Sequence, residues 1–282
     1  MKKQLNAVKW IVIAASLIAW IGGNAHAGVP LTAIEGAGGI AFNPLAYVAG
    51  QNKGQADEAW AWKPDFISKP QFGFWYVNLG DIDADWVSHG AAFSVFDRLE
   101  FSYSHEVIAP DGKNIHKNNV GTKLLLVPEN AGGKSFVPAI AAGAIFKQTS
   151  DVADGVDNSA VDFYGVATKL ITALPAPVLL SGGLRSSRGY VNGVFGYDDE
   201  RDVTLFGNAN VILSSKLTLG LEFEQGSKFD SFENANHWNA NLAWLYDANL
   251  TLVLAYVNGG DHESTSEVGL GDGVVLSAQY AF

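Results

Sequence analysis

The last ten residues, 273-GVVLSAQYAF-282, carry an apolar side chain at every second position. Val274, Leu276, Ala278, Tyr280 and Phe282 fall on one parity, and side chains of a β-strand point alternately to its two faces. The stretch therefore predicts a strand with one continuous apolar face that extends to the final Phe.

The same alternation recurs through most of the chain before that stretch. In residues 217–224, four apolar side chains alternate with Thr218, Gly220, Glu222 and Glu224. A period of two over eight or more residues indicates a strand whose faces lie in different environments. The segments that we expect to be strands are 71–79, 87–96, 99–107, 120–127, 136–147, 161–171, 178–186, 203–213, 217–224, 237–246, 250–258 and 273–282.

A soluble β-sandwich would also alternate, so the connections between strands decide the fold class. Tight turns such as Asp97-Arg98 and 247–249 alternate with connections of about a dozen residues, the pattern of outer-membrane barrels. The longer connections hold 17 Asp and Glu but only 5 Lys and Arg, so charge is concentrated at one rim. We therefore predict an all-β transmembrane antiparallel up-and-down β-barrel of 12 strands over residues 71–282, with both ends in the periplasm.

Residues 1–27 have the features of a signal peptide. Three lysines accompany an apolar run over 10–23, and Ala25-His26-Ala27 fits the small-residue cleavage pattern. A membrane-spanning helix needs about 20 apolar residues, and this run is shorter. We expect cleavage before Gly28 and export of the remaining chain.

Composition excludes several classes of protein. Without residues 1–27 the chain has 15 Lys and Arg against 29 Asp and Glu, and a net charge of −14 should repel nucleic acid. The absence of cysteine excludes disulfides, thiolate metal sites and cysteine nucleophiles. We expect a monomer in the bacterial outer membrane, in contact with membrane lipids and lipopolysaccharide and with no nucleic-acid partner.

Two short motifs stand before the strand pattern: Glu35-Gly36-Ala37-Gly38-Gly39 and Asn43-Pro44-Leu45-Ala46-Tyr47. In these motifs and in its overall layout the chain resembles an uncharacterised proteobacterial family of outer-membrane β-barrels, catalogued as a domain of unknown function. The resemblance implies location and fold, and it brings no activity or catalytic residues. The last strand resembles the C-terminal signal that the barrel-assembly machinery reads, with Tyr280 and Phe282 as its aromatic residues.

Residues 28–70 allow three interpretations: a periplasmic lead, a plug, or one further pair of strands that would give 14 in all. Pro44 argues against a central strand. Residues 36–41 read G-x-G-x-x-A, but a dinucleotide site needs a preceding strand and a following helix, and Asn43-Pro44 stops a helix. We therefore expect no cofactor.

Several charged side chains have the parity that points into the barrel. Burying them in a dry interior is costly, so they should be paired or meet water. Eight-stranded barrels are filled by side chains and barrels of 16 to 18 strands are open, so twelve strands allow either state. The predicted lumen residues are Glu100, Glu106, Lys147, Asp162, Arg185, Glu222 and Glu224.

The carboxylates in this set favour a narrow passive channel for small cationic or neutral polar solutes. One alternative is a closed barrel with a structural or surface-interaction role. Another is a membrane-embedded lipid hydrolase, for which His105 is the most enzyme-like residue. Ser102 and Ser104 point to the opposite face from His105, so no nucleophile can be placed beside it and we predict no catalytic residues and no enzyme.

Two further groups stand out. Asp81, Asp83 and Asp85 alternate in the first outer loop and could form a loose divalent-cation contact, although Trp86 and Ala92 replace the Gly and Glu of a calcium loop. Aromatic residues near strand ends are expected to form belts at the membrane interfaces. They are Trp75, Tyr103, Trp238, Trp244, Tyr246, Tyr256, Tyr280 and Phe282.

Overall fold

The computed structural model describes residues 31–50, 66–110, 113–230 and 232–282, so the predicted signal peptide lies outside the described residues. Among these residues no helix is long and apolar enough to cross a membrane. Two short 3-10 helices, η2 (Gly80–Ile82) and η3 (Ala131–Gly133), accompany the strands. The strands are β1 (Gln71–Leu79), β2 (Ala84–Val95), β3 (Leu99–Pro110), β4 (Ile115–Val127), β5 (Ala139–Thr149), β6 (Ser159–Ile171), β7 (Val178–Gly189), β8 (Tyr197–Ser214), β9 (Leu217–Glu224), β10 (Lys228–Phe229), β11 (Phe232–Glu233), β12 (His237–Leu245), β13 (Leu250–Asn258) and β14 (Asp272–Ala281).

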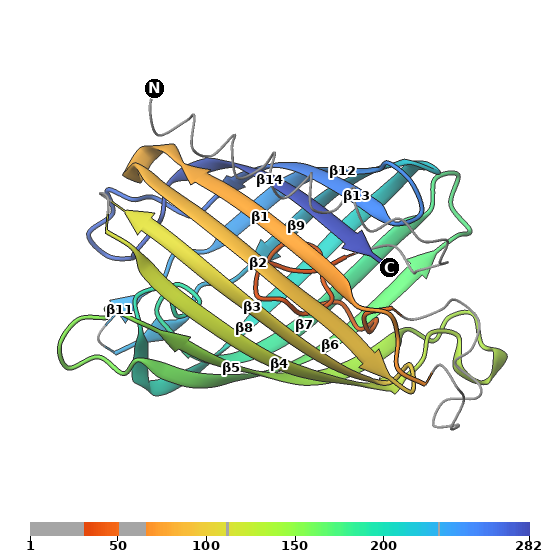
Figure 1. The fold of residues 1–282 in the computed structure, drawn as a ribbon, viewed down its shortest axis with the longest axis horizontal. Helices are drawn as coiled ribbons and strands as arrows, with labels where there is room; N and C mark the ends of the chain where they lie inside the picture. Colours follow the sequence, from red (N-terminus) through yellow and green to blue (C-terminus); the bar gives the residue numbers. More distant parts are fainter. Residues whose placement is uncertain (1–30, 51–65, 111–112, 231) are drawn as a thin grey trace.

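Twelve of these strands form a closed antiparallel barrel in chain order (Figure 1). β1 pairs with β2 on one side and with β14 on the other, and the closing register runs from Gln71 opposite Ala281 to Leu79 opposite Gly273. β10 and β11 form a separate two-stranded hairpin in an outer loop. The prediction of a twelve-stranded barrel is confirmed, and the fourteen-strand alternative does not describe the residues that the structure covers.

Several strands continue further toward the outer rim than the sequence pattern indicates. β4 begins at Ile115 rather than at residue 120, and β8 begins at Tyr197 rather than at residue 203. These added residues are paired with the neighbouring strands, as Ile115 is with Ile108 in β3. Ladder hydrogen bonds hold them in the sheet although their polar composition is typical of loops.

The alternation of side chains divides the barrel into an outer apolar face and an interior. Leu221, Leu254 and Phe223 are exposed on the outside, whereas Glu222 and Glu224 are buried within. One aromatic residue departs from the predicted belts. Trp75 is 1% exposed and points inward, because Phe72, Phe74 and Tyr76 take the outward parity of β1.

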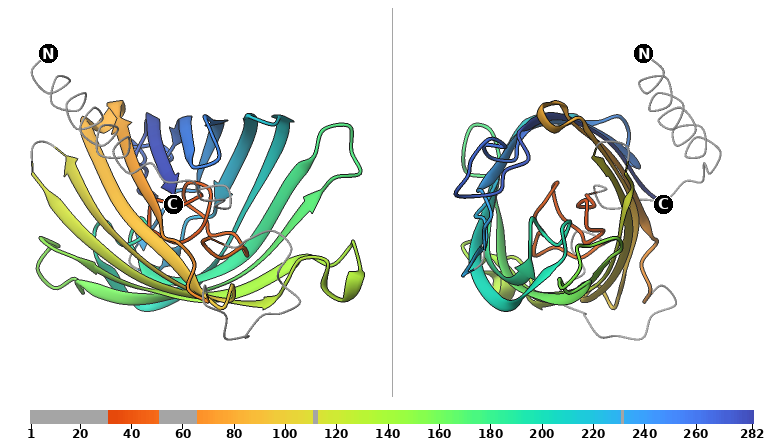
Figure 2. Two further views of the ribbon diagram at one scale, coloured as in Figure 1. Left: turned by 45° about the vertical axis from the view of Figure 1, so that its right-hand side comes forward. Right: turned by 90° about the vertical axis from the view of Figure 1, so that its left-hand side faces the viewer.

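Residues 31–50, which we call the plug, lie inside the barrel (Figure 2). Their backbone turns on itself through the isolated bridges Thr32 to Gly38 and Gly39 to Pro44, and it adds no strand to the barrel. Nearly all plug side chains are buried. Residues 31–50 thus lie within the lumen, and their role as a plug stays a prediction.

Two apolar clusters hold the plug from opposite sides of the lumen. Ile34 and Ala41 pack in a cluster that is built mainly on β1, β2, β13 and β14. Ala46 and Val48 pack in a second cluster that is built on β4, β5, β6 and β8. The lumen is therefore filled by packed side chains as well as by charged ones.

On the lipid-facing surface, the loss of stability that an introduced charge causes should depend on its depth in the membrane. Leu254 in β13 is 52% exposed and lies opposite Leu242 and Leu276 on the two neighbouring strands. We expect Leu254→Arg to lower the free energy of unfolding in detergent or lipid by about 2–4 kcal/mol, because a cation at mid-membrane is poorly solvated. Tyr246→Arg, beside the periplasmic turn, is the control and should cost about 0–1 kcal/mol. Equal losses at both positions, measured by denaturant titration, would contradict the predicted membrane embedding.

Candidate functional site: the plugged lumen

The centre of the lumen holds a carboxylate of the plug against three cations of the wall. Glu35 accepts from Lys117 Nζ of β4 at 3.0 Å, from Lys147 Nζ of β5 at 2.5 Å and from Arg185 Nη1 of β7 at 3.0 Å. All four side chains are at most 4% exposed. Charged groups of this kind are stable in a dry interior only when they are paired, and here one plug side chain joins three strands.

The same three cations also have partners on the wall. Lys117 pairs with Glu106 at 3.0 Å, and Lys147 pairs with Asp162 at 2.6 Å. Arg185 pairs with Glu224 of β9 at 3.3 Å. The three cations and three wall carboxylates are balanced among themselves, so Glu35 is the additional anion that the plug brings.

Electrostatics keep this additional carboxylate ionised. Burial alone would raise the pKa of Glu35, but the positive charges of Lys147, Lys117 and Arg185 hold the pKa well below its usual value. A lowered folded-state pKa means that the contribution to stability is complete above the ordinary Glu pKa of 4.5 and is lost only as pH falls through the lower folded value. The ion cluster should therefore persist at neutral and mildly acidic pH.

A second contact clamps the plug backbone against β3 and β4. Glu100 accepts hydrogen bonds from the amides of Gly38 at 3.0 Å and Ala49 at 2.7 Å. Lys123 pairs with Glu100 at 3.0 Å and donates to the carbonyl oxygen of Gly38 at 2.9 Å. A wall ion pair thus binds two plug amides and one plug carbonyl.

A third contact lies on the opposite wall, at β9 and β12. Glu222 accepts from the amides of Phe42 at 3.1 Å and Asn43 at 2.9 Å, and from Asn239 Nδ2 at 2.7 Å. Asn43 Nδ2 donates to the carbonyl oxygen of Phe223 at 3.1 Å. Two wall carboxylates on opposite sides therefore satisfy plug amides that form no strand ladder.

Further hydrogen bonds extend these contacts around the wall. The plug partners come from β14, β1, β2 and β6, and from the connection between β4 and β5, so the plug is bonded in several directions. The bonds are Thr32 N to Gln279 Oε1 at 2.7 Å, Trp75 Nε1 to Thr32 O at 2.9 Å, Ser88 Oγ to Ile34 O at 2.6 Å, Ala46 N to Thr168 Oγ1 at 2.8 Å and Tyr47 OH to Glu129 Oε2 at 2.8 Å.

The glycines of the first motif let the plug approach the wall closely. Gly36 has φ +89, and a Cβ there would lie 2.8 Å from the backbone carbon and oxygen of Tyr103 in β3. A Cβ on Gly38 would lie 2.8 Å from Glu100 Oε2. The motif is explained by backbone contact with the wall rather than by phosphate binding.

All seven predicted lumen residues lie in the interior, at 2% exposure or less. Three other buried charged residues were not among the predicted ones: Glu35, Lys117 and Lys123. Lys117 was missed because β4 was predicted to begin at residue 120, whereas Lys123 had the inward parity and could have been found. Glu35 has no strand parity to reveal it, and only its isolated charge within a glycine-rich stretch marks it.

The three aspartates of the first outer loop do not come together on one point. Asp81 accepts from the amide of Asp272 at 2.8 Å, whereas Asp85 accepts from Tyr76 OH at 2.8 Å. Asp83 has a left-handed backbone at φ 46. Over the described ranges, no group of three or more His, Asp or Glu side chains is arranged to hold a metal ion.

The most enzyme-like histidine is held by neighbours other than a nucleophile. His105 Nδ1 lies 3.0 Å from Asn118 Oδ1, and His105 Nε2 lies 3.4 Å from His116 Nδ1. Ser102 and Ser104 are buried on the interior side of β3. None of these contacts places a hydroxyl nucleophile beside the imidazole.

The end of the last strand meets the start of the first. The Phe282 ring packs edge-on against Phe72 and Tyr280, and the Phe282 amide donates to the carbonyl oxygen of Pro70 at 3.3 Å. Recognition of Tyr280 and Phe282 by the assembly machinery stays a prediction.

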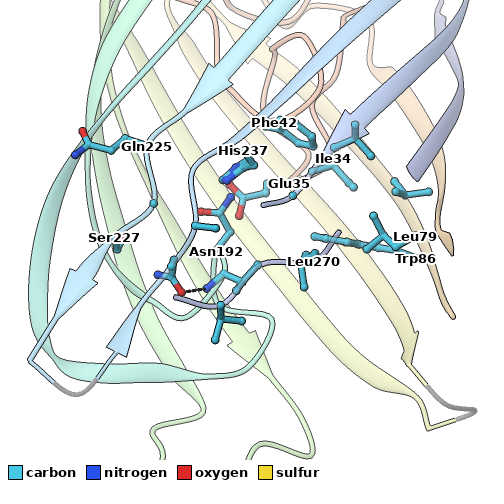
Figure 3. A pocket seen from close by; sticks show the side chains of 18 of the residues that line it. Ile34, Glu35, Phe42, Leu79, Trp86, Asn192, Gln225, Ser227, His237 and Leu270 are labelled. Atoms are coloured by element: carbon cyan, nitrogen blue, oxygen red, sulfur yellow. Dashed lines mark hydrogen bonds between the residues drawn. The ribbon is translucent and has the colours of Figure 1, made fainter. Parts of the chain in front are cut away.

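On the outer side of the plug lies a cavity of about 60 Å³ (Figure 3). Glu35, Phe42 and His237 lie together on one side of it, and Leu79 and Trp86 lie on another. Outer-loop residues complete the lining, among them Asn192, Asn234, Val268 and Leu270. The plug and the outer loops therefore enclose a small chamber between them.

Comparisons with known proteins give a family and a fold. The family model described as "Protein of unknown function (DUF3034)" matches residues 28–279. No curated protein matches the chain.

Solved structures with a similar fold are outer-membrane barrels. The chain is similar to a KdgM porin, with a TM-score of 0.52 and 16% identity over 75% of this chain and 99% of that chain. A KdgM porin in complex with disordered oligogalacturonate gives 0.52 and 15% over 75% and 99%. The COG4313 outer membrane channel from Pseudomonas putida F1 gives 0.46 and 13% over 79% and 100%. The closed barrel and its likeness to porins locate the protein in the bacterial outer membrane.

Removing the plug carboxylate should loosen the plug. Because the chain has no native cysteine, Ala41→Cys places a single thiol in the buried plug. We expect Glu35→Gln to speed labelling of that thiol by a water-soluble reagent about tenfold or more, because charge-assisted hydrogen bonds are lost. The parent should label slowly from pH 5 to pH 8, since Glu35 remains ionised. Glu233→Gln, in the outer hairpin, is the matched control, and equal labelling rates in both variants would refute the role of Glu35.

A steric change should have the same effect without altering charge. Gly36→Ala places a methyl group against the Tyr103 backbone, so we expect faster labelling of Cys at position 41. Gly132→Ala is the control, because Gly132 also has a positive φ, of +63, but a Cβ there meets nothing within 4 Å. If the two alanine variants label alike, close backbone contact does not position the plug.

Proposed function

The chain belongs to the family described as "Protein of unknown function (DUF3034)", and we propose that it is a gated outer-membrane channel for small polar solutes. In this proposal residues 31–50 close the lumen at rest, and solutes pass when the plug shifts or leaves. The predicted narrow passive channel is thereby kept, and the plug is added to it as a gate.

The observation that supports gating is the polar contact between plug and wall. Glu35, Glu100 and Glu222 make its central bonds, as ion pairs or as carboxylates that accept from backbone amides. A permanent filling gains more from apolar packing, since buried ion pairs often add little net stability. Charges and hydrogen bonds can instead be exchanged for water when a segment moves away, as at transient interfaces between domains.

The wall charges suit small neutral solutes and give cations a slight preference. With the plug displaced, five carboxylates and four cations of the described strands would face the lumen, so the excess there is one negative charge. This negative excess is smaller than that of the predicted lumen residues, because Lys117 and Lys123 were not among them. The carboxylates are Glu100, Glu106, Asp162, Glu222 and Glu224, and the cations are Lys117, Lys123, Lys147 and Arg185.

We also propose that the protein is not an enzyme. The His105 imidazole contacts Asn118 and His116 on the outer face, and the nearby serines of β3 point into the lumen. A serine hydrolase needs its nucleophile within hydrogen-bond reach of its base.

Single-channel recording in planar bilayers tests the channel. We expect residues 28–282 to be closed for most of the recording, and deletion of residues 31–50 to raise the mean current at least tenfold. Folding of the deletion variant is checked by its heat-dependent mobility in gel electrophoresis. A deletion variant that folds and inserts but never conducts would show that the barrel is sealed.

A crosslink tests gating without deleting the plug. Ala46→Cys combined with Thr168→Cys joins the plug to β6 at a place where the Ala46 amide contacts the Thr168 hydroxyl oxygen. Oxidation should abolish the residual openings, and a reductant should restore them. Each single-cysteine variant is the control, and openings that survive a verified crosslink would exclude plug movement as the gate.

A further inference from the structure

The lumen on the outer side of the plug has one strongly apolar wall. Val77, Leu79, Trp86 and Val257, from β1, β2 and β13, are all buried there. They belong to one apolar cluster, which the plug joins through Ile34.

The cavity of about 60 Å³ lies against this wall (Figure 3). Ile34 and Phe42 of the plug contribute apolar surface, and Leu270 contributes more from the last outer loop. A single water needs roughly 10–15 Å³, so the space admits several waters or one small organic molecule. The lining favours a molecule with an apolar body.

One residue that lines this cavity has a polar group without a partner. Trp86 is 9% exposed, and its indole Nε1 finds no hydrogen-bond partner among the described residues. The other lumen tryptophan differs, since Trp75 Nε1 donates to the Thr32 carbonyl oxygen at 2.9 Å. A buried donor without an acceptor is unfavourable, so a bound molecule whose acceptor reaches this nitrogen as the indole turns toward the cavity would satisfy it.

The charged groups around the cavity are already paired. Glu35 has three cationic partners, and Glu224 pairs with Arg185 at 3.3 Å and with His237 at 3.2 Å. A charged ligand would have to displace one of these pairs, whereas an uncharged one would not.

We propose that this outer chamber binds a small uncharged molecule with an apolar body and one hydrogen-bond acceptor, which the Trp86 indole N–H recognises. The assignment rests on the proposed channel, because it names the class of solute that the channel accepts from outside. A ligand seated here contacts the plug through Ile34 and Phe42 and the outer loops through Leu270, so its binding is coupled to the position of the plug.

Binding can be measured on the closed, full-length mature protein, independently of conductance. The probe is cyclopentanone, which has an apolar ring and one carbonyl acceptor, and the measurement is saturation-transfer NMR in detergent micelles. We expect saturable binding, and about fivefold weaker binding by Trp86→Phe, which keeps an aromatic ring but loses the donor. Trp244→Phe, on the outer face of β12, is the matched control and should bind as the parent does.

A variant that fills the cavity distinguishes binding in the cavity from binding to the micelle or to other surfaces of the protein. Leu270→Trp should abolish saturable binding because the larger side chain occupies the chamber. Binding that survives in Leu270→Trp, or no binding by the parent, overturns the site. Equal affinity of the parent and Trp86→Phe overturns the role of the indole donor. Each of these results leaves the conductance test of the channel unaffected, so the two proposals can fail separately.

Discussion

The organisation of the lumen depends on one buried carboxylate, Glu35, that lies between three cations of the barrel wall. Those cations come from β4, β5 and β7, and each also pairs with a wall carboxylate. These three cations are balanced by their three wall carboxylates without the plug, so Glu35 is attracted to three positive groups without being needed to neutralise them. This arrangement allows the plug to be held firmly and still be removable, because its departure leaves no wall cation unpaired.

The rest of the plug follows from that anchor. Ile34 and Glu35 are neighbours in the chain. Ile34 packs in the apolar cluster of the wall, and Glu35 pairs with the wall cations. Gly36 then turns the backbone at a position where a side chain would clash with β3. Beyond Gly36, plug amides donate to Glu100 on one side of the lumen and to Glu222 on the other. These carboxylates take the place of the carbonyl acceptors that a neighbouring strand would provide. The result is a compact segment whose backbone bonds partly to itself and partly to the wall, and which has no place in the sheet.

Much of the barrel could be predicted from the sequence because lipid and lumen impose opposite demands on alternate residues. The parity of Leu221 and Glu222 is clear without a structure, and so are the twelve strands of residues 71–282, whereas a further pair of strands in residues 28–70 stayed an open alternative. Parity is uninformative where both faces carry apolar side chains, as in β1, where aromatic residues occur on both parities and Trp75 was assigned to the outside. It is also uninformative at the outer rim, where polar residues such as those of 115–119 pair as a strand only because β3 continues beside them. The plug sequence has no periodic alternation of polar and apolar residues. Its contacts are with residues far away in the chain, so no local sequence pattern predicts them.

Amide hydrogen exchange of residues 31–50 in the folded, membrane-inserted protein tests the central claim most directly. The account predicts slow exchange at the amides of Gly38, Phe42, Asn43, Ala46 and Ala49, because wall side chains accept their hydrogen bonds inside the lumen. Exchange of these amides at the rate of an unstructured peptide, while the barrel strands stay protected, would show that the plug does not occupy the lumen.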